Sequence, residues 1–178
     1  ASSAFRRYRN PQTQGAYPLR GKFVNVREMV PSKVVQNKEV QELMAAIGLK
    51  IGHEPNDLRY GQILLYTDAD VDGNSISGLL INFFGKFWPE LFERGIVKKV
   101  DTPLMVAKKG KKSLNFYTDS EFKEWESKQR NLNGWNIEYK KGLAALEDKE
   151  YEEIIKNPKT FTLVKDKYFN LTLETWFS

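Results

Sequence analysis

The apolar positions of the chain change from helical to strand spacing several times. Over residues 40–47 they follow the i, i+3, i+4, i+7 spacing of an amphipathic helix, with Asn37 as its expected N-cap and Gly48 at its end. The short apolar run at 62–67 predicts a buried strand, and a second helical stripe occupies residues 76–87. This alternation of periods favours an α/β class.

Shorter elements complete the pattern. Residues 21–26 are a strand candidate, whereas residues 1–21, rich in arginine, glutamine and glycine, are expected to form mostly loop. Thr118 and Glu121 have the spacing of a capping box that opens a helix. The remaining strand candidates are 96–100, 103–107, 113–117 and 136–140, and the remaining helix candidates are 118–129 and 147–156.

Composition excludes several classes of protein. Of the 178 residues, 40% are hydrophobic, which is enough for a packed core and excludes wholesale disorder. The chain has no cysteine and a single histidine, His53, so disulfide frameworks, thiolate zinc sites and multi-histidine metal sites are excluded. His53 is expected to be a loop residue without a chemical role. No apolar run approaches the roughly 18 residues of a membrane span, and we expect a soluble, cytoplasmic protein.

The net charge of +5 is unevenly distributed. Residues 1–33 carry seven basic side chains against Glu28, whereas residues 34–178 together are close to neutral. A basic segment of this kind suits a polyanion such as DNA, RNA or an anionic membrane surface, although charge alone is equally compatible with an ordinary solvated surface. The six lysines between residues 98 and 112 are expected to be surface residues of that ordinary kind.

Three aspartates, Asp68, Asp70 and Asp72, alternate with small apolar residues directly after the strand at 62–67. In extended backbone, alternate side chains share a face, so the three carboxylates would converge. At about 4 Å and an effective dielectric of about 20, each pair would repel by about 4 kcal/mol. Oxygen ligands without histidine or cysteine favour Mg²⁺ as the neutralising cation, and a solvated acidic turn is the alternative.

Three metal or phosphate chemistries share this acidic opening. An EF-hand loop requires a glutamate at its twelfth position, where this chain has Leu79, and it also requires a helix before the loop. A haloacid-dehalogenase-type phosphotransferase expects threonine or valine two residues after its second aspartate, where this chain offers Asp72 or Asn74. The third is a metal-assisted phosphodiester site at the carboxyl end of a strand, facing the start of a helix.

Four segments in order resemble the Toprim domain of type IIA DNA topoisomerases, in the ATPase-bearing part related to the gyrase B subunit. QILLYTDADVDGNSI resembles its acidic signature, YPLRGKFVNVRE its PLRGK stretch, DLRYGQI its approach to the acidic strand, and YKKGLAALEDKEY its KGLG loop. In detail the chain is most similar to the tailed-bacteriophage branch, which would place it in the host cytoplasm. Ser75 and Ala144 depart from the family pattern, which has histidine and glycine at these places.

The resemblance implies a Toprim fold, with a parallel sheet flanked by helices over residues 1–108 and a mixed α+β extension over residues 109–178. The first strand and its glutamate motif would lie upstream of Ala1. It also implies Mg²⁺-dependent (or Mn²⁺-dependent) cleavage and religation of double-stranded DNA by a tyrosine on a partner domain or subunit. ATP would be bound by a domain outside this chain and would drive strand passage, and the chain alone would be inactive.

The resemblance also assigns roles to individual residues. Asp68 would hold the catalytic metal, and Asp70 and Asp72 would complete a second metal position. DNA would be bound from two sides, by Arg20, Gly21, Lys22 and Asn25 and by Lys141 and Gly142. A non-catalytic module that docks DNA or metal, and the phosphotransferase, remain alternative functions.

Overall fold

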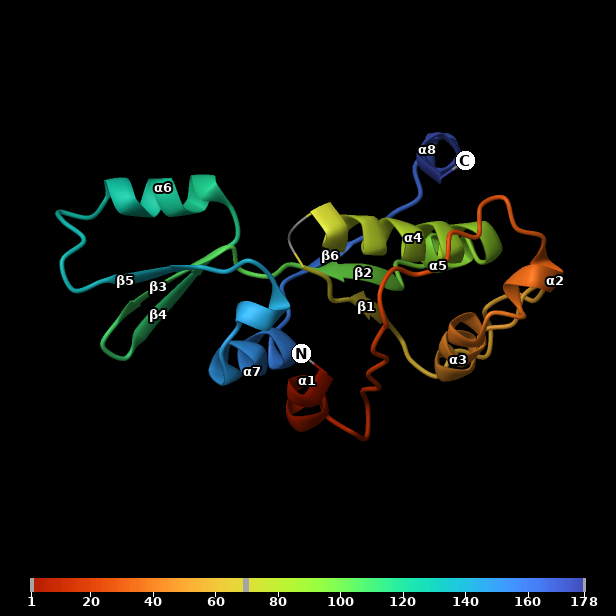
Figure 1. Ribbon diagram of the computed structural model, residues 1–178, viewed down its shortest axis with the longest axis horizontal. Helices are drawn as coiled ribbons and strands as arrows, with labels where there is room; N and C mark the ends of the chain where they lie inside the picture. Colours follow the sequence, from red (N-terminus) through yellow and green to blue (C-terminus); the bar gives the residue numbers. More distant parts are fainter. Residues whose placement is uncertain (1, 69–70, 178) are drawn as a thin grey trace.

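The computed structural model describes residues 2–68 and 71–177 as helices and two small sheets (Figure 1). The helices are α1 (Ser2–Tyr8), α2 (Pro31–Val34), α3 (Lys38–Ile47), α4 (Val71–Phe87), α5 (Glu90–Glu93), α6 (Asp119–Ser127), α7 (Asp148–Lys156) and α8 (Phe169–Phe177), with a 3₁₀ turn at Leu143–Ala145. The strands are β1 (Ile63–Leu65), β2 (Val97–Val100), β3 (Met105–Lys109), β4 (Lys112–Phe116), β5 (Asn136–Tyr139) and β6 (Thr160–Thr162). None of the described helices is long and apolar enough to cross a membrane.

The first sheet has the order β1-β2-β6. β1 and β2 are parallel, with Ile63 opposite Val97, and they are joined by the long crossover helix α4, as parallel strands require. β6 returns from the end of the chain and pairs antiparallel with β2. The α/β class is therefore confirmed, but among the described residues the sheet is mixed rather than wholly parallel, because its third strand arrives from the opposite direction.

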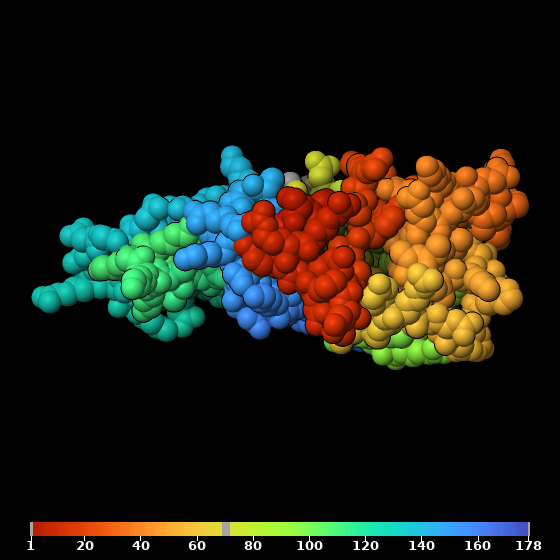
Figure 2. Space-filling view, turned by 90° about the horizontal axis from the view of Figure 1, so that it is seen from below, coloured from red at the N-terminus to blue at the C-terminus, as the bar shows by residue number. Residues whose placement is uncertain are grey.

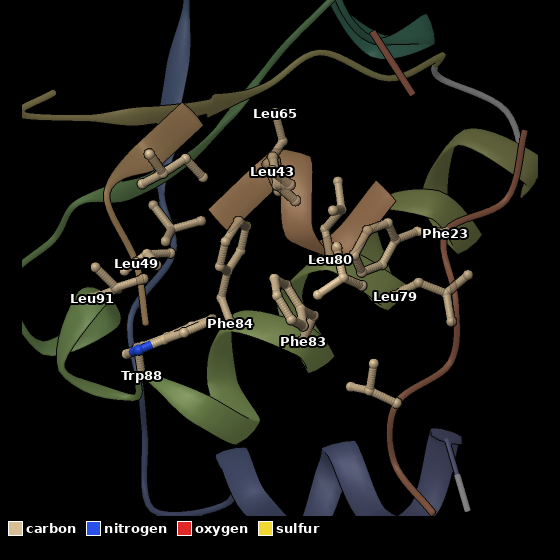
Figure 3. Packing of buried hydrophobic residues seen from close by; sticks show 14 of the residues in the cluster. Phe23, Leu43, Leu49, Leu65, Leu79, Leu80, Phe83, Phe84, Trp88 and Leu91 are labelled. Carbon is tan, nitrogen blue, oxygen red and sulfur yellow. The ribbon is translucent and has the colours of Figure 1, made fainter. Parts of the chain in front are cut away.

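The main core lies between this sheet, α3 and α4. Leu65 of β1, Leu43 of α3 and Phe83 and Phe84 of α4 belong to one buried cluster, closed by Trp88 (Figure 3). The Asn37 side chain caps α3 by accepting from the Val40 N–H group, and Gly48 ends the helix with φ 91°, as the sequence predicts.

Glycines on α4 allow α8 to pack closely. An added Cβ at Gly78 would lie 2.9 Å from Phe177, and one at Gly85 would lie 2.8 Å from Phe169. The two glycines are seven residues apart and so lie on one face of α4. Close contacts at this face hold both ends of α8, at Phe169 and at Phe177, against α4.

The second sheet, β4-β3-β5, is antiparallel throughout and carries α6 on one face. Met105, Ala107 and Phe116 form its small core with Trp125 of α6. This unit forms one end of an elongated molecule (Figures 1 and 2). The Thr118 hydroxyl caps α6 by accepting from Glu121 N–H, which confirms the predicted helix start.

Two sequence predictions near the N-terminus are wrong. Residues 21–26 form no strand: they pair with neither sheet among the described residues, and the Val26 carbonyl at their end accepts hydrogen bonds from the Lys86 ammonium group and the Met29 N–H group instead of from a neighbouring strand. Residues 2–8, expected to be loop, form α1, which packs beside α7 through the buried Ala4 (Figures 1 and 2).

Candidate metal and nucleic-acid site

Asp68 follows β1 and lies where the chain turns into α4. The Thr67 hydroxyl is hydrogen-bonded to the Ser77 hydroxyl at 2.7 Å, and the Ser77 hydroxyl donates to the Gly73 carbonyl at 3.0 Å. The turn that bears Asp68 is therefore tied to the first turns of α4. Oδ1 of Asp68 accepts a hydrogen bond of 2.6 Å from the Leu143 N–H group, in the loop before α7.

Glycines enclose Asp68 on two sides. Gly142 has φ 141°, and an added Cβ there would lie 2.7 Å from the Asp68 carboxylate. An added Cβ at Gly73 would lie 2.1 Å from the Asp68 carbonyl oxygen. Since real Cβ atoms do not come this close, only glycine fits at either position without movement of the backbone.

Hydrogen bonds from two side chains support the loop that carries Gly142. The Tyr151 hydroxyl donates to the Leu143 carbonyl, and the Lys140 ammonium group donates to the Ala145 carbonyl at 3.2 Å. Lys140 is only 5% exposed, whereas its neighbour Lys141 is exposed to solvent. One lysine therefore supports the loop, and the other is available to a ligand.

An ion pair between Lys22 and Asp72 joins the N-terminal basic segment to the first turn of α4. Nζ of Lys22 lies 3.3 Å from Oδ1 of Asp72, and both side chains are largely exposed. Asp72 belongs to the first turn of α4, where the helix dipole favours a negative charge. Nearby, Gly21 has φ 90°, and an added Cβ would meet no described atom within 4 Å, so its backbone is open to a ligand.

Arg20 and Asn25 lie on the same segment but are placed differently. The backbone N–H of Arg20 donates to Glu39, while its side chain is exposed. The Asn25 amide donates to the Phe177 carbonyl at 2.9 Å, and its oxygen accepts from Arg27 N–H and from Asn82. The polar atoms of Asn25 are thus engaged within the protein.

Two contacts join the predicted site residues. Gly142 lies against Asp68, and Lys22 pairs with Asp72. Asp70, the third predicted ligand, lies outside the described residues. The described residues contain no group of three or more acidic or histidine side chains placed to hold a metal. The donors present, Asp68 and Asp72, are carboxylate oxygens of the kind that Mg²⁺ prefers, so they fit that ion chemically.

A hollow of about 190 Å³ adjoins Asp68. Its polar lining includes Thr67, Asn74, Lys99, Asp101, Thr102 and Tyr117. Lys99 donates to Asn74 at 2.7 Å, and burial raises the pKa of Asp101, a shift that Lys159 opposes. Sequence reasoning missed these residues. The parallel pairing of β1 with β2 could have revealed them, because the carboxyl ends of parallel strands meet at one edge of a sheet.

A charge cluster around the buried side chains of Lys140 and Glu150 joins the second sheet to α7. Lys140 lies 2.7 Å from Glu138 and 3.1 Å from Glu150, and Lys108 lies 2.7 Å from Glu147 and 3.3 Å from each of the other two carboxylates. Burial lowers the pKa of Lys140, but its hydrogen bonds to Glu138 and Glu150 raise that pKa overall. Lys108, expected to be an ordinary surface lysine, is instead a partly buried member of this cluster.

Comparison with known proteins identifies both parts of the chain. Residues 1–101 match the family model of the Toprim domain, and residues 100–170 match that of the C-terminal associated domain of TOPRIM. DNA topoisomerase 2 of Arabidopsis thaliana is 46% identical over 147 residues, which cover 77% of this chain and 10% of that protein. DNA topoisomerase 2 of Plasmodium falciparum is 39% identical over 157 residues, covering 84% and 11% respectively.

A solved structure has the same fold. The DNA-binding, cleavage and re-ligation domain of Plasmodium falciparum topoisomerase II superposes with a TM-score of 0.80 at 34% identity, covering 91% of this chain and 23% of that one. The chain thus spans about a tenth of the length of the curated relatives it matches. With a Toprim match over more than half of its residues, the chain belongs to the Toprim family.

Proposed function

We propose that this chain is the metal-binding part of a type II DNA topoisomerase, and that it supports cleavage and religation of double-stranded DNA by a tyrosine elsewhere in the holoenzyme. The observation that carries the proposal is that two distant segments each contact an aspartate of the acidic segment. Leu143 N–H binds Asp68, and Lys22 pairs with Asp72. The KGLG-like and PLRGK-like segments are therefore each joined to the acidic segment by a direct contact.

Asp68 is the residue best placed to hold the catalytic Mg²⁺, with Asp72 and Asp70 as the second position. A bound Mg²⁺ would supply charge stabilisation at the 3′ oxygen that leaves the phosphate. The protein's own contribution is to orient the Asp68 carboxylate, through the Leu143 N–H bond, before any cation binds. Orientation of this kind lowers the cost of forming the site.

Arg20, Lys22 and Lys141 are proposed to bind backbone phosphates, with Gly21 and Gly142 allowing close approach. Such contacts position a duplex but do not read its sequence. Lys22 has a second use: it neutralises Asp72 in the absence of another cation, and loss of that pair would leave its ammonium group available to a phosphate. Asn25 is a weaker candidate for DNA contact, because its amide is bonded to Phe177 and Asn82.

ATP-driven strand passage belongs to the proposal as a property of the holoenzyme, with ATP bound by another domain. The family match argues against the haloacid-dehalogenase interpretation. The tailed-bacteriophage affinity stays a prediction. So does the division at residues 108/109, near the point where the two family matches meet at residues 100–101.

Calorimetric titration with Mn²⁺, which has the charge and the preference for oxygen ligands of Mg²⁺, tests the metal role. Binding should be weak and should be lost in Asp68→Asn, while the control Asp57→Asn, which alters an exposed carboxylate after α3, should bind as the unmodified protein does. Equal heats for all three proteins would contradict the assignment of Asp68 and leave the family membership untouched.

A further inference from the structure

The segment that carries Arg20 and Lys22 is held in an unusual way. Residues 19–29, here called the N-terminal arm, run over α4 with a turn at residues 27–28 and without joining either sheet, among the described residues. Buried backbone carbonyls require hydrogen-bond donors, which a neighbouring strand normally supplies. In the arm a single side chain makes three such bonds, and the Val26 carbonyl also accepts a hydrogen bond of 3.1 Å from the Met29 N–H group.

Lys86 on α4 supplies the missing bonds. Its Nζ donates to the carbonyls of Val26 at 2.7 Å, Arg27 at 2.8 Å and Met29 at 2.8 Å. An ammonium group has three N–H donors, so these three carbonyls use its full capacity. Lys86 is half-buried, and burial together with the nearby Arg27 lowers its pKa. A lysine so placed makes no further hydrogen bond to a ligand.

Neighbouring contacts fix the rest of the arm. Phe23 and Val26 are buried in the main core. Asn25 is bonded to Asn82 of α4 and to the last turn of α8, and Arg27 pairs with Glu174 of α8 at 2.7 Å. Lys22 directly precedes Phe23, so the position of its ammonium group beside Asp72 depends on where this anchored stretch lies.

We propose that Lys86 is a positioning residue, whose ammonium group holds the N-terminal arm on α4 so that Arg20 and Lys22 face the acidic turn. The inference deepens the proposed function, on which its DNA readout rests, while its structural readout needs no DNA. α4 is then a common support, since its first turn carries Asp72 and its last turn carries Lys86. Because both residues belong to α4, this helix sets the position of the arm relative to Asp72.

Lys86→Met tests this, because methionine keeps an apolar stem of similar length but removes the ammonium donor from all three carbonyls. Among the described residues only the Val26 carbonyl then keeps a second donor, the Met29 N–H group. In the full enzyme without DNA, hydrogen exchange at the amides of Arg27 and Met29 should become at least about tenfold faster. Exchange in α3 and in β3 should stay unchanged. Lys128→Met, which breaks an exposed pair with Glu124 on α6, is the matched control and should leave the arm unaffected. Lys86→Arg, which keeps hydrogen-bond donors, should restore slow exchange in part.

The DNA readout separates positioning from simple loss of folded protein. In Lys86→Met, the slope of log affinity against log salt should fall by about two, as in the double variant Arg20→Ala/Lys22→Ala, although both cations are present. Adding Lys86→Met to that double variant should change the slope no further. A reduced folded fraction alone would lower the apparent affinity without changing the slope.

Unchanged exchange at Arg27 and Met29 in a folded Lys86→Met protein would overturn the proposal. Faster exchange throughout α3 and β3 would also overturn it, because Lys86 would then support the fold as a whole. Faster exchange confined to the arm, with no change of salt slope even in the Arg20→Ala/Lys22→Ala variant, would uphold the positioning role of Lys86 and contradict the proposed contact between the arm and DNA.

Discussion

The Leu143 N–H group donates a 2.6 Å hydrogen bond to Oδ1 of Asp68, across 75 residues of sequence. A backbone donor cannot rotate away as a side chain can, so it fixes the orientation of one carboxylate oxygen. The other oxygen accepts no hydrogen bond from the described residues. The close approach is possible because residue 142 is glycine. The candidate site therefore depends on the loop before α7 as much as on the acidic turn itself.

Gly142→Ala should disturb Asp68 directly. The new Cβ would lie 2.7 Å from the carboxylate, and the backbone at φ 141° disfavours any side chain. We expect metal-dependent cleavage by the holoenzyme to fall by about tenfold or more, since a displacement on the order of 1 Å at such a site can cost about a hundredfold.

The matched control for this substitution is Gly52→Ala. It places alanine at φ 82°, where an added Cβ would meet no described atom within 4 Å. It therefore carries the backbone strain without the contact to Asp68. Equal losses in the two variants would mean that strain alone, and not the approach to Asp68, explains the effect.

Arg20→Ala and Lys22→Ala should each weaken duplex binding evenly across DNA sequences and reduce the salt slope by about one. Phosphate contacts carry no base information, so no sequence should be spared. The double variant Lys111→Ala/Lys112→Ala, at the tip of the β3–β4 hairpin, is the comparison and should have a smaller effect. Similar slopes for the two pairs would indicate diffuse electrostatic attraction instead of a defined site.

Acid should weaken the charge cluster at the base of the second sheet. The hydrogen bond from Lys140 is the largest cause that holds the pKa of Glu138 below its usual value of 4.5, with burial opposing it. A lowered carboxylate pKa contributes stability above pH 4.5 that is lost as the pH falls through the folded-state value. Urea unfolding from pH 7 down to pH 3 should therefore show a steeper loss of stability in the unmodified protein than in Glu138→Gln.

At pH 7, Glu138→Gln should cost about 1–3 kcal/mol, because it removes a carboxylate partner from a lysine that is 5% exposed. Glu124→Gln, which alters an exposed pair on α6, should change stability much less. Parallel pH profiles for the unmodified protein and Glu138→Gln would contradict the role given to this carboxylate.

Local signals in the sequence predicted the elements that depend on local chemistry. Asn37 and Gly48 mark the ends of α3, and Thr118 marks the start of α6, because caps act within a few residues. The expected extended run of three aspartates after β1 was wrong for Asp72, which lies in the first turn of α4, and Asp70 lies outside the described residues. The stretch at 21–26 was not predictable, since its last carbonyl, that of Val26, accepts a hydrogen bond from Lys86, about sixty residues away, and only the tertiary structure shows this.

Only those residues of the candidate site that belong to a recognisable motif were predictable from the sequence. Asp68, Lys22 and Gly142 could be selected by resemblance, and the structure places Gly142 against Asp68 and Lys22 beside Asp72. Asn25 was selected in the same way, yet its side chain is bonded to α4 and α8. Lys99 and Asp101 were missed, because their nearness to Asp68 follows from the parallel pairing of β1 with β2, which no single segment encodes.

The central claim is that Asp68 directly supports DNA cleavage. Covalent DNA–tyrosine complexes should be measured in the holoenzyme at ordinary Mg²⁺, in parallel with ATP hydrolysis and thermal unfolding. Asp68→Asn should nearly abolish the complexes while leaving ATP hydrolysis and unfolding unchanged, and Asp72→Asn should reduce them less completely. Normal amounts of covalent complex from the Asp68→Asn enzyme would contradict the account and leave these acids a structural or docking role.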